Sequence, residues 1–296
     1  PAVPPGGTSS VSGYRVQGGG LVATALVACA RLGAQCALYS LLGDDAVGDQ
    51  ITAELENERV DVRGVFRVPG GASPFSFIHV DENSGERTIF HRSGASLDTD
   101  PALGGSLDLQ GFHALVIDDI YPSLAALAAC QAQELGIPVI ADMIPSPANR
   151  QLLQHVDILI APKHYASQAG FASHPEQVLE QIHQMGPSTA VLTLGADGWI
   201  YSAPDGAGHG EAFQVEVMDT TGAGDSFHGA FAYGAALGWE TSRCCEFAGA
   251  VAAIKCTKPG GRSGLPDLGQ ALAFLTERNR AGWGGLGESQ AEERSR

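Results

Sequence analysis

Positive charge and long apolar runs are what this chain has least of. Its 296 residues hold 17 Lys and Arg against 33 Asp and Glu, which gives a formal net charge of −16. So acidic a surface repels phosphate backbones and anionic lipid headgroups, and we expect neither nucleic acid nor a membrane as a partner. The longest apolar run, residues 21–30, is too short to span a bilayer, and no signal peptide is recognisable, so we expect a cytoplasmic protein.

Two nucleotide-binding signatures are also missing. No Gly-Lys-Ser/Thr occurs, which excludes a Walker A kinase, and no Gly-x-Gly-x-x-Gly follows an early strand, which excludes a nicotinamide dehydrogenase. The six cysteines match neither a disulfide framework nor a zinc site, so buried free thiols are expected. With 44% hydrophobic and 17% charged residues, the composition is that of one large globular domain, or of one domain with a small appendage.

What is present is an alternation of strands and helices. Apolar runs predict strands at residues 36–41, 113–118, 138–142, 156–161 and 190–194. Helical periodicity predicts helices at residues 20–32, 47–58, 123–135 and 175–185. Strands separated by helices form parallel βαβ units, so the expected fold class is α/β, with helices on both faces of a mainly parallel sheet.

Residues 64–92 break this alternation. Short segments at 65–68, 75–80 and 87–91 predict two or three antiparallel strands, the last two joined by a polar turn at 81–86. Together with the weakly alternating residues 8–17, they would form a small β-sheet that is either a decorated edge of the core or a lid over a pocket. We expect a single domain over residues 1–278 and a flexible tail over residues 279–296, which are rich in Gly, Glu and Arg.

The most informative segment is Asp219-Thr-Thr-Gly-Ala-Gly-Asp225. Residues 213–218 before it alternate like a strand, and apolar residues after it recur at helical spacing, which predicts a strand-to-helix turn. The two glycines allow backbone conformations that are closed to other residues. The amides of Gly222, Ala223 and Gly224 can then point together at the start of the helix, where an anion is favoured.

Asp225 lies beside this predicted anion hole. A carboxylate there would repel a resting phosphate, so helix capping alone explains it poorly, although an Asp N-cap behind a glycine turn is common. The carboxylate suits a base that takes the proton from an alcohol attacking a phosphoryl group. We therefore predict Asp225 as the catalytic base of a phosphotransferase.

The full string resembles the C-terminal signature of the PfkB (ribokinase-like) carbohydrate kinases. Near the N-terminus, Gly18-Gly-Gly20 with its small-residue helix, and Leu42-Gly-Asp-Asp45, are similar to the first signature of that family. The string Ala252-Ala-Ile-Lys-Cys-Thr-Lys-Pro-Gly-Gly-Arg262 looks closest to the sulfofructose kinase and ketohexokinase branches. The resemblance implies a three-layer α/β/α core with a β-sheet lid. It also implies an ATP-dependent kinase acting on a primary hydroxyl of a ketose or related sugar.

At the sugar end, the resemblance implies that the backbone at Gly19 and Gly20 approaches the sugar hydroxyls, with Arg92 from the lid and Asp118 as further contacts. Close helix–sheet packing is the alternative role of the two glycines. Thr24 stands where the family usually has Asn. The family also opens with a strand and a sugar-binding Asp, which nothing before residue 18 supplies. We expect this strand to be lost or absent, which would compromise both the central sheet and sugar binding.

At the nucleotide end, the resemblance implies phosphate or ribose contacts from the loop that holds Thr193, Gly195 and Gly198, although a plain hairpin turn suits this loop nearly as well. Adenine would lie in a groove beside small residues, namely Ala248, Gly249, Ala252 and Gly260. In related enzymes, backbone carbonyls hold a K⁺ ion, and by position these would come from Asp219, Thr221, Lys255, Lys258 and Gly260. Pro162-Lys-His-Tyr165 stands where many members have Asn-x-x-Glu, so Mg²⁺ is expected to be held mainly by ATP and water.

Two other functions stay open at this point. One is a catalytically impaired nucleotide- or sugar-binding regulator of the same fold, which the missing strand and residues 162–165 favour. The other is a nucleoside kinase. The intact Asp225 opposes a pure binder, which has no need of a carboxylate beside phosphate. Because the lids of such family members often clasp one another, a homodimer through the lid is also expected.

Overall fold

The largest sheet has six strands in the order β10-β9-β8-β7-β6-β5. The computed structural model describes residues 8, 10–80, 87–94, 97, 107–165, 174–278, 280 and 283. Strands β5 to β8 run parallel, and β9 and β10 are added antiparallel to them. The strands are β5 (Leu115–Ile117), β6 (Val139–Ala141), β7 (Ile158–Pro162), β8 (Thr189–Thr193), β9 (Trp199–Ala203) and β10 (Gly206–Gly210).

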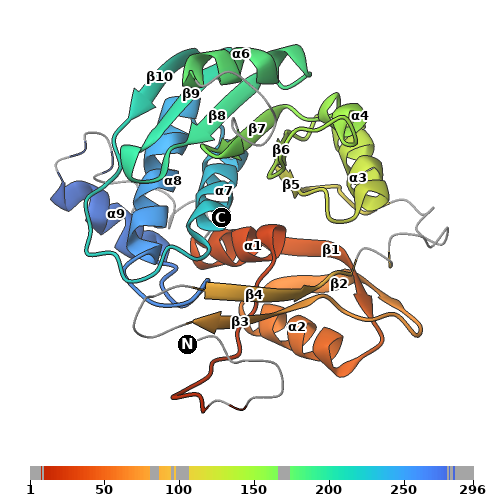
Figure 1. Cartoon of the computed structure of the whole chain (residues 1–296). Coiled ribbons are helices and arrows are strands. Elements are labelled where there is room, and N and C mark those ends of the chain that lie inside the picture. The colour runs from red at the N-terminus through yellow and green to blue at the C-terminus, as the bar shows by residue number, and fades with distance from the viewer. Residues whose placement is uncertain are drawn as a thin grey trace, which may run out of the picture.

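Helices cover both faces of this sheet (Figure 1). Leu159 and Ala161 of β7 pack with the helices of one face, and Ile160 between them packs with those of the other. On the first face lie α3 (Pro122–Leu135), α4 (Arg150–Leu153) and α6 (Pro175–Gln184), and on the second lie α7 (Ala223–Ala236), α8 (Thr241–Lys255) and α9 (Leu268–Glu277). The predicted three-layer α/β/α core is therefore confirmed, because successive strand residues point to opposite faces.

Local signals in the sequence set several helix boundaries. Helix α3 begins at Pro122, whose missing amide costs nothing in a first turn, and ends at Gly136, which takes the left-handed conformation at φ 70°. Asp267 caps α9 in a reciprocal capping box with Gln270. Two further helices are α1 (Leu21–Arg31) and α2 (Ala46–Asn57), and α2 begins behind Asp45, whose side chain accepts from the Gly48 amide.

A second, smaller unit joins α1 and α2 to the parallel pair β1 (Cys36–Gly43) and β2 (Val60–Val68). Val27, Leu38, Leu55 and Val60 form its core. Among the described residues, β1 and β5 are not hydrogen-bonded to each other, so the central sheet stands in two parts. Both strands line one cavity of about 2610 Å³.

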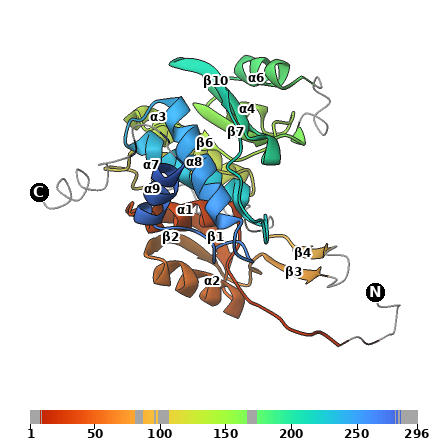
Figure 2. The same cartoon turned by 90° about the vertical axis from the view of Figure 1, so that its left-hand side faces the viewer.

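Three sequence predictions differ from the structure. Residues 65–68 are not a lid strand but the end of β2, which pairs parallel with β1. Residues 213–218 form no strand, because the amides of Met218 and Asp219 donate to the carbonyl of Cys256 rather than to a neighbouring strand. Residues 10–17 likewise carry no strand. What remains of the predicted lid is the antiparallel hairpin of β3 (Phe75–Val80) and β4 (Arg87–Arg92), which projects from the smaller unit (Figure 2). The predicted turn at 81–86 lies outside the described residues.

One described residue of the predicted tail, Trp283, is packed against the core. Trp283 is 2% exposed, lies against Trp239 and Phe247, and donates from its indole to Glu246. Within the described part of the chain, no helix has the length and apolarity needed to cross a bilayer. The cysteines are free thiols, of which Cys36 and Cys130 are half-buried and the other four are buried.

Candidate active site

The turn before α7 keeps the glycine conformation that the sequence predicts, but not all three of the predicted amides are free to bind an anion. Gly222 has φ 76°, and a Cβ there would collide with the carbonyl oxygen of Gly261. Only glycine meets both conditions. The Ala223 amide donates to the Thr220 carbonyl at 3.1 Å, so it closes the turn instead of pointing at a ligand. An added Cβ at Gly224 would meet nothing within 4 Å, which shows open space beside the first turn of the helix.

The Asp219 carboxylate holds this turn in place through two hydrogen bonds. It accepts from the Thr221 amide at 2.8 Å and from the Gly260 amide at 2.7 Å. Burial raises the pKa of Asp219, but these two hydrogen bonds outweigh burial and hold the pKa below its usual value. A permanently ionised Asp219 therefore ties the turn to the loop that follows α8.

Asp225 lies in the first turn of α7 and lines the large cavity. Burial, and after it the negative charge of Asp142, raise the pKa of Asp225 to about 7, against the opposing positive charges of His228 and Arg262. A general base works best with a pKa near the working pH, because it is then ionised yet still basic. The position and the pKa of Asp225 both suit a base that deprotonates an alcohol.

His228 and Asp142 lie directly beneath the base. The Nδ1 atom of His228 is 2.9 Å from the Gly224 carbonyl and 3.4 Å from Asp142 Oδ2, and its Nε2 atom is 3.0 Å from the Ile160 carbonyl. The contacts of the two ring nitrogens link the first turn of α7 to β7, with Asp142 beside Nδ1.

The predicted sugar-contact residues Asp118, Gly19 and Gly20 all line the same cavity as Asp225. Asp118 follows β5 at its carboxyl end, where ligands bind in parallel α/β sheets. Burial raises the pKa of Asp118 to about 6, Asp142 and Asp119 add to this, and the hydrogen bond from the Ile120 amide opposes it. The backbone of Val22, in the first turn of α1, also lowers this pKa, so Asp118 lies near the start of α1 and Gly20, which has φ 87°.

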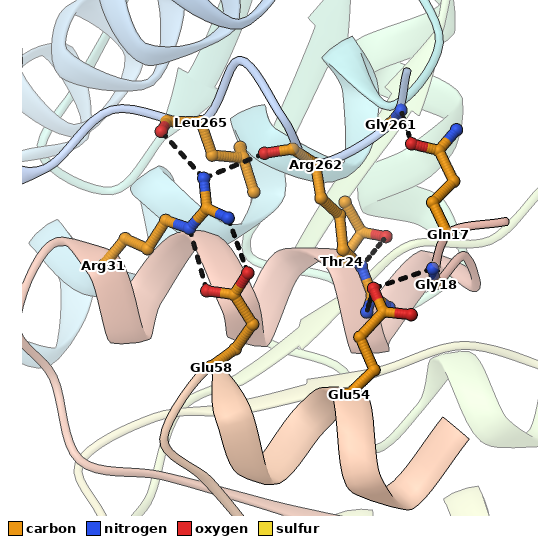
Figure 3. Close-up of polar contacts among 9 residues, drawn as sticks. All are labelled: Gln17, Gly18, Thr24, Arg31, Glu54, Glu58, Gly261, Arg262 and Leu265. Carbon is orange, nitrogen blue, oxygen red and sulfur yellow. Dashed lines mark hydrogen bonds and ion pairs between the residues drawn. The ribbon is translucent and has the colours of Figure 1, made fainter. Parts of the chain in front are cut away.

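Arg262 holds the glycine segment in place (Figure 3). Its guanidinium is 4% exposed and donates to the Gly19 carbonyl at 2.7 Å, to Thr24 Oγ1 at 3.2 Å and to Glu54 Oε1 at 3.2 Å. Glu54 also accepts from the Gly18 amide at 2.7 Å. One buried arginine from the loop after α8 therefore fixes the Gly18–Gly19 backbone, α1 and α2 around the cavity.

Arg92 is not brought into the site. It donates to the Ser73 carbonyl from Nη2 at 2.6 Å and to Asp45 Oδ2 at 3.3 Å, and its guanidinium stacks on the Phe75 ring. Arg92 is absent from the cavity wall, which His91 and Ser93 line instead. Its contacts attach the base of the β3–β4 hairpin to the start of α2, so the predicted sugar contact gives way to a structural one.

Two of the residues predicted to contact the nucleotide, Ala248 and Gly249, pack against other parts of the protein instead of lining a groove. Ala248 is fully buried in the core of the α7–α9 face, and a Cβ at Gly249 would collide with the Trp199 ring, so both serve helix–sheet packing. Gly198 has φ 89° at the turn before β9, where a Cβ would collide with the Gly210 carbonyl. Thr193 ends β8 and its carbonyl accepts from the Lys163 amide, and Ala252 is half-buried. Contacts of Thr193, Gly195, Ala252 and Gly260 with a nucleotide stay predictions.

The predicted cation loop contains a buried ammonium. Lys255 ends α8, is 0% exposed, and donates from Nζ to the backbone carbonyl of Asp219 at 2.7 Å. Burial lowers the pKa of the Lys255 ammonium, and the carboxylates of Asp219 and Asp225 are among the groups that oppose this. Lys258, three residues on, is exposed.

Sequence reasoning missed Asp142, His228 and Arg262. Asp142 follows β6 directly, and a carboxylate at the carboxyl end of a parallel strand was a usable signal. His228 lies three residues after Asp225, a spacing that places both on one side of α7. Arg262 is the last residue of the loop string and carried no sign of its buried contacts.

The fold and this site are those expected of an α/β phosphotransferase, with a glycine turn at the start of α7, the carboxylate of Asp225 beside it, and a cavity that reaches a glycine segment. The pfkB family carbohydrate kinase model matches residues 3–268. The chain therefore belongs to the pfkB family of carbohydrate kinases, as its motifs indicate.

The chain is similar to known relatives over most of the length of both chains. The chain is 30% identical over 285 residues to a ribokinase of Haemophilus influenzae, covering 92% of this chain and 91% of that one. It is 27% identical over 276 residues to an ATP-dependent ribose-1-phosphate kinase of Halopiger xanaduensis, covering 92% and 91%. The crystal structure of a putative ribokinase from Agrobacterium tumefaciens superposes with a TM-score of 0.84 at 28% identity, covering 93% of this chain and 92% of that one. The ribokinase-like fold is thus confirmed, whereas these matches leave the branch within the family open.

Proposed function

We propose that the protein is an ATP-dependent kinase that transfers the γ-phosphoryl group to a primary hydroxyl of a ketose or related sugar. The observation that carries the proposal is Asp225, whose pKa lies at about 7 beside the glycine turn at the start of α7. The carboxylate takes the hydroxyl proton as the alcohol oxygen attacks phosphorus in line. Amides at the start of α7 then stabilise charge on the transferring group, an effect worth about 10²–10³ in rate for one preorganised donor.

The acceptor would lie against Gly19 and Gly20, with Asp118 accepting from its hydroxyls. This assignment is supported by the shared cavity and by the buried Arg262, which makes the glycine backbone rigid. Mg²⁺ would enter with ATP, because the described residues include no group of three or more His, Cys, Asp or Glu that could hold a metal ion. We propose a cytoplasmic location from the acidic, reduced-thiol character of the chain, and a single kinase domain over residues 1–278.

The test is a coupled ADP-release assay with MgATP over ketoses, aldoses, pentose phosphates, nucleosides and sugar acids, with ³¹P NMR to identify the product. We expect turnover on a ketose and a phosphate ester at its primary carbon. A nucleoside acceptor would identify a nucleoside kinase instead. Binding of ATP without turnover on any acceptor would contradict the proposal and favour the regulator.

A homodimer through the β3–β4 hairpin is the proposed assembly. The hairpin exposes large apolar side chains, which proteins seldom leave in water without a partner; these are Phe75, Phe77, Ile78, Ile89 and Phe90. Light scattering after size exclusion should give a dimer for the native chain and a monomer for Phe77→Ser with Phe90→Ser. Leu135→Ser is the matched control, because Leu135 is an exposed apolar residue at the end of α3. A monomeric native chain would rule the dimer out.

A further inference from the structure

Lys255 carries a charge whose burial needs an explanation. It is one of three lysines in the chain, and its side chain is 0% exposed. Burying an ammonium is costly unless it is paired or well hydrogen-bonded. The acceptor that the structure gives it is the backbone carbonyl of Asp219, at 2.7 Å from Nζ.

The Lys255 ammonium lies against Asp219, the residue that leads into the glycine turn before α7. Asp219 is held rigidly, because its two carboxylate oxygens accept from the amides of Thr221 and Gly260. The positive charge of Lys255 is therefore fixed at the foot of the turn that leads to Gly222 and α7. The base Asp225 is close enough to interact with it electrostatically.

Two of the five carbonyls expected to hold a K⁺ ion are already in contact with other groups. The Asp219 carbonyl already accepts from the Lys255 ammonium. The Lys255 carbonyl accepts from the Lys258 amide at 3.4 Å and lies against Gly264, where a Cβ would collide with it. A second cation on the Asp219 carbonyl would stand next to the buried ammonium, and like charges at such close range repel strongly away from bulk water.

We propose that the Lys255 ammonium stands in for the monovalent cation of related kinases, so that phosphoryl transfer by this chain needs no K⁺. The proposal rests on the proposed kinase function. An ammonium has the same unit charge as K⁺ and contacts the same carbonyl, but it is tethered to α8. Lys255 touches neither substrate nor the reacting atoms, so it acts as a positioning residue that keeps positive potential beneath the bound phosphates.

A purely structural role for Lys255, tying the segment before α7 to α8, predicts something different. Replacing Lys255 would then lower stability and turnover without any dependence on which cation is present. If Lys255 acts as a tethered cation instead, removing its side chain leaves a site that a free cation of the right size can fill. The choice of salt therefore separates the two roles.

The experiment compares initial rates in chlorides of K⁺, Na⁺, Cs⁺ and tetramethylammonium at one ionic strength. For the native chain we expect rates within about twofold of one another, since exposed charges are screened equally in all four. Lys255→Ala should lose about 10²-fold in tetramethylammonium, the loss typical of one electrostatic contact in an active site, and K⁺ should restore much of it. Arg63→Ala is the control, because it removes an exposed cation on β2 whose side chain is 91% exposed.

A second readout does not depend on activity. The thermal unfolding midpoint of the native chain should be equal in K⁺ and tetramethylammonium, whereas that of Lys255→Ala should rise selectively with K⁺. Lys255→Met fills the vacancy without charge and should show neither rescue. Strong activation or stabilisation of the native chain by K⁺ would overturn the proposal, as would a Lys255→Ala variant that responds to no cation. If the native chain phosphorylates no acceptor, the proposed function fails, and the midpoints still decide the role of Lys255.

Discussion

Asp225→Asn should inactivate the protein and at the same time stabilise it above neutral pH. In the folded chain the pKa of Asp225 is about 7, against 3.8 for an unperturbed Asp. Between these two values the folded state holds a proton that the unfolded state has released. Stability therefore falls as pH rises from about 4 to about 7 and is level above that range. Ionising Asp225 in its buried place is a cost that the neutral amide of Asn avoids.

The magnitude follows from the size of the shift. A difference of about three pKa units, at about 1.4 kcal/mol each, amounts to about 4 kcal/mol. Asn and protonated Asp can form different hydrogen bonds, but the resulting difference in stability is the same at every pH. The pH dependence of the stability difference between the two proteins therefore reports the ionisation of Asp225. Relative to the native chain, Asp225→Asn should gain about 4 kcal/mol more stability at about pH 8 than at about pH 4.

The assay is chemical denaturation of both proteins across this pH range, together with kcat/KM against pH. The native kcat/KM should rise with pH and level off above about 7, because only the ionised carboxylate accepts the proton. Asp225→Asn should lose about 10²–10⁴-fold or more in turnover. Asp61→Asn, at a surface ion pair with Arg63, is the matched control and should keep full turnover. A stability gain that is equal at both pH values, or a native rate that is flat through pH 7, would refute the reasoning.

Three further substitutions test the groups around the base. Arg262→Met leaves the half-buried Glu54 carboxylate without its cation and should destabilise the fold by about 1–3 kcal/mol in denaturant titrations, while raising KM for the acceptor more than KM for ATP. His228→Gln removes a positive charge that lowers the pKa of Asp225, so the rising limb of kcat/KM should move to higher pH; an unmoved limb would show that His228 is neutral. Gly222→Ala forces a side chain into φ 76° and should cost at least about 1–2 kcal/mol of stability and most of the turnover, which thermal melts and rates measure.

Periodicity along the chain was enough to predict the core helices and the parallel strands. Helices bury every third or fourth residue and strands every second, and this pattern is local. It was wrong at residues 213–218 and 65–68. An alternating pattern shows that a segment is extended, but the neighbour that accepts its hydrogen bonds decides whether it is a strand, and in which sheet. For residues 213–218 the neighbour is the end of α8, and for residues 65–68 it is β1.

The sequence by itself determined the glycine turn before α7, because its main backbone conditions lie within seven consecutive residues. Gly222 is needed for a local backbone angle, and Asp219 bonds an amide two residues away. Only the tertiary structure decided what surrounds the turn. Asp142, His228, Arg262 and Lys255 come from separate elements or bond to distant ones, so their contacts depend on the fold. Burial and the charges of Asp142, His228 and Arg262 set the pKa of Asp225, because electrostatic energy depends on distance in space and on burial.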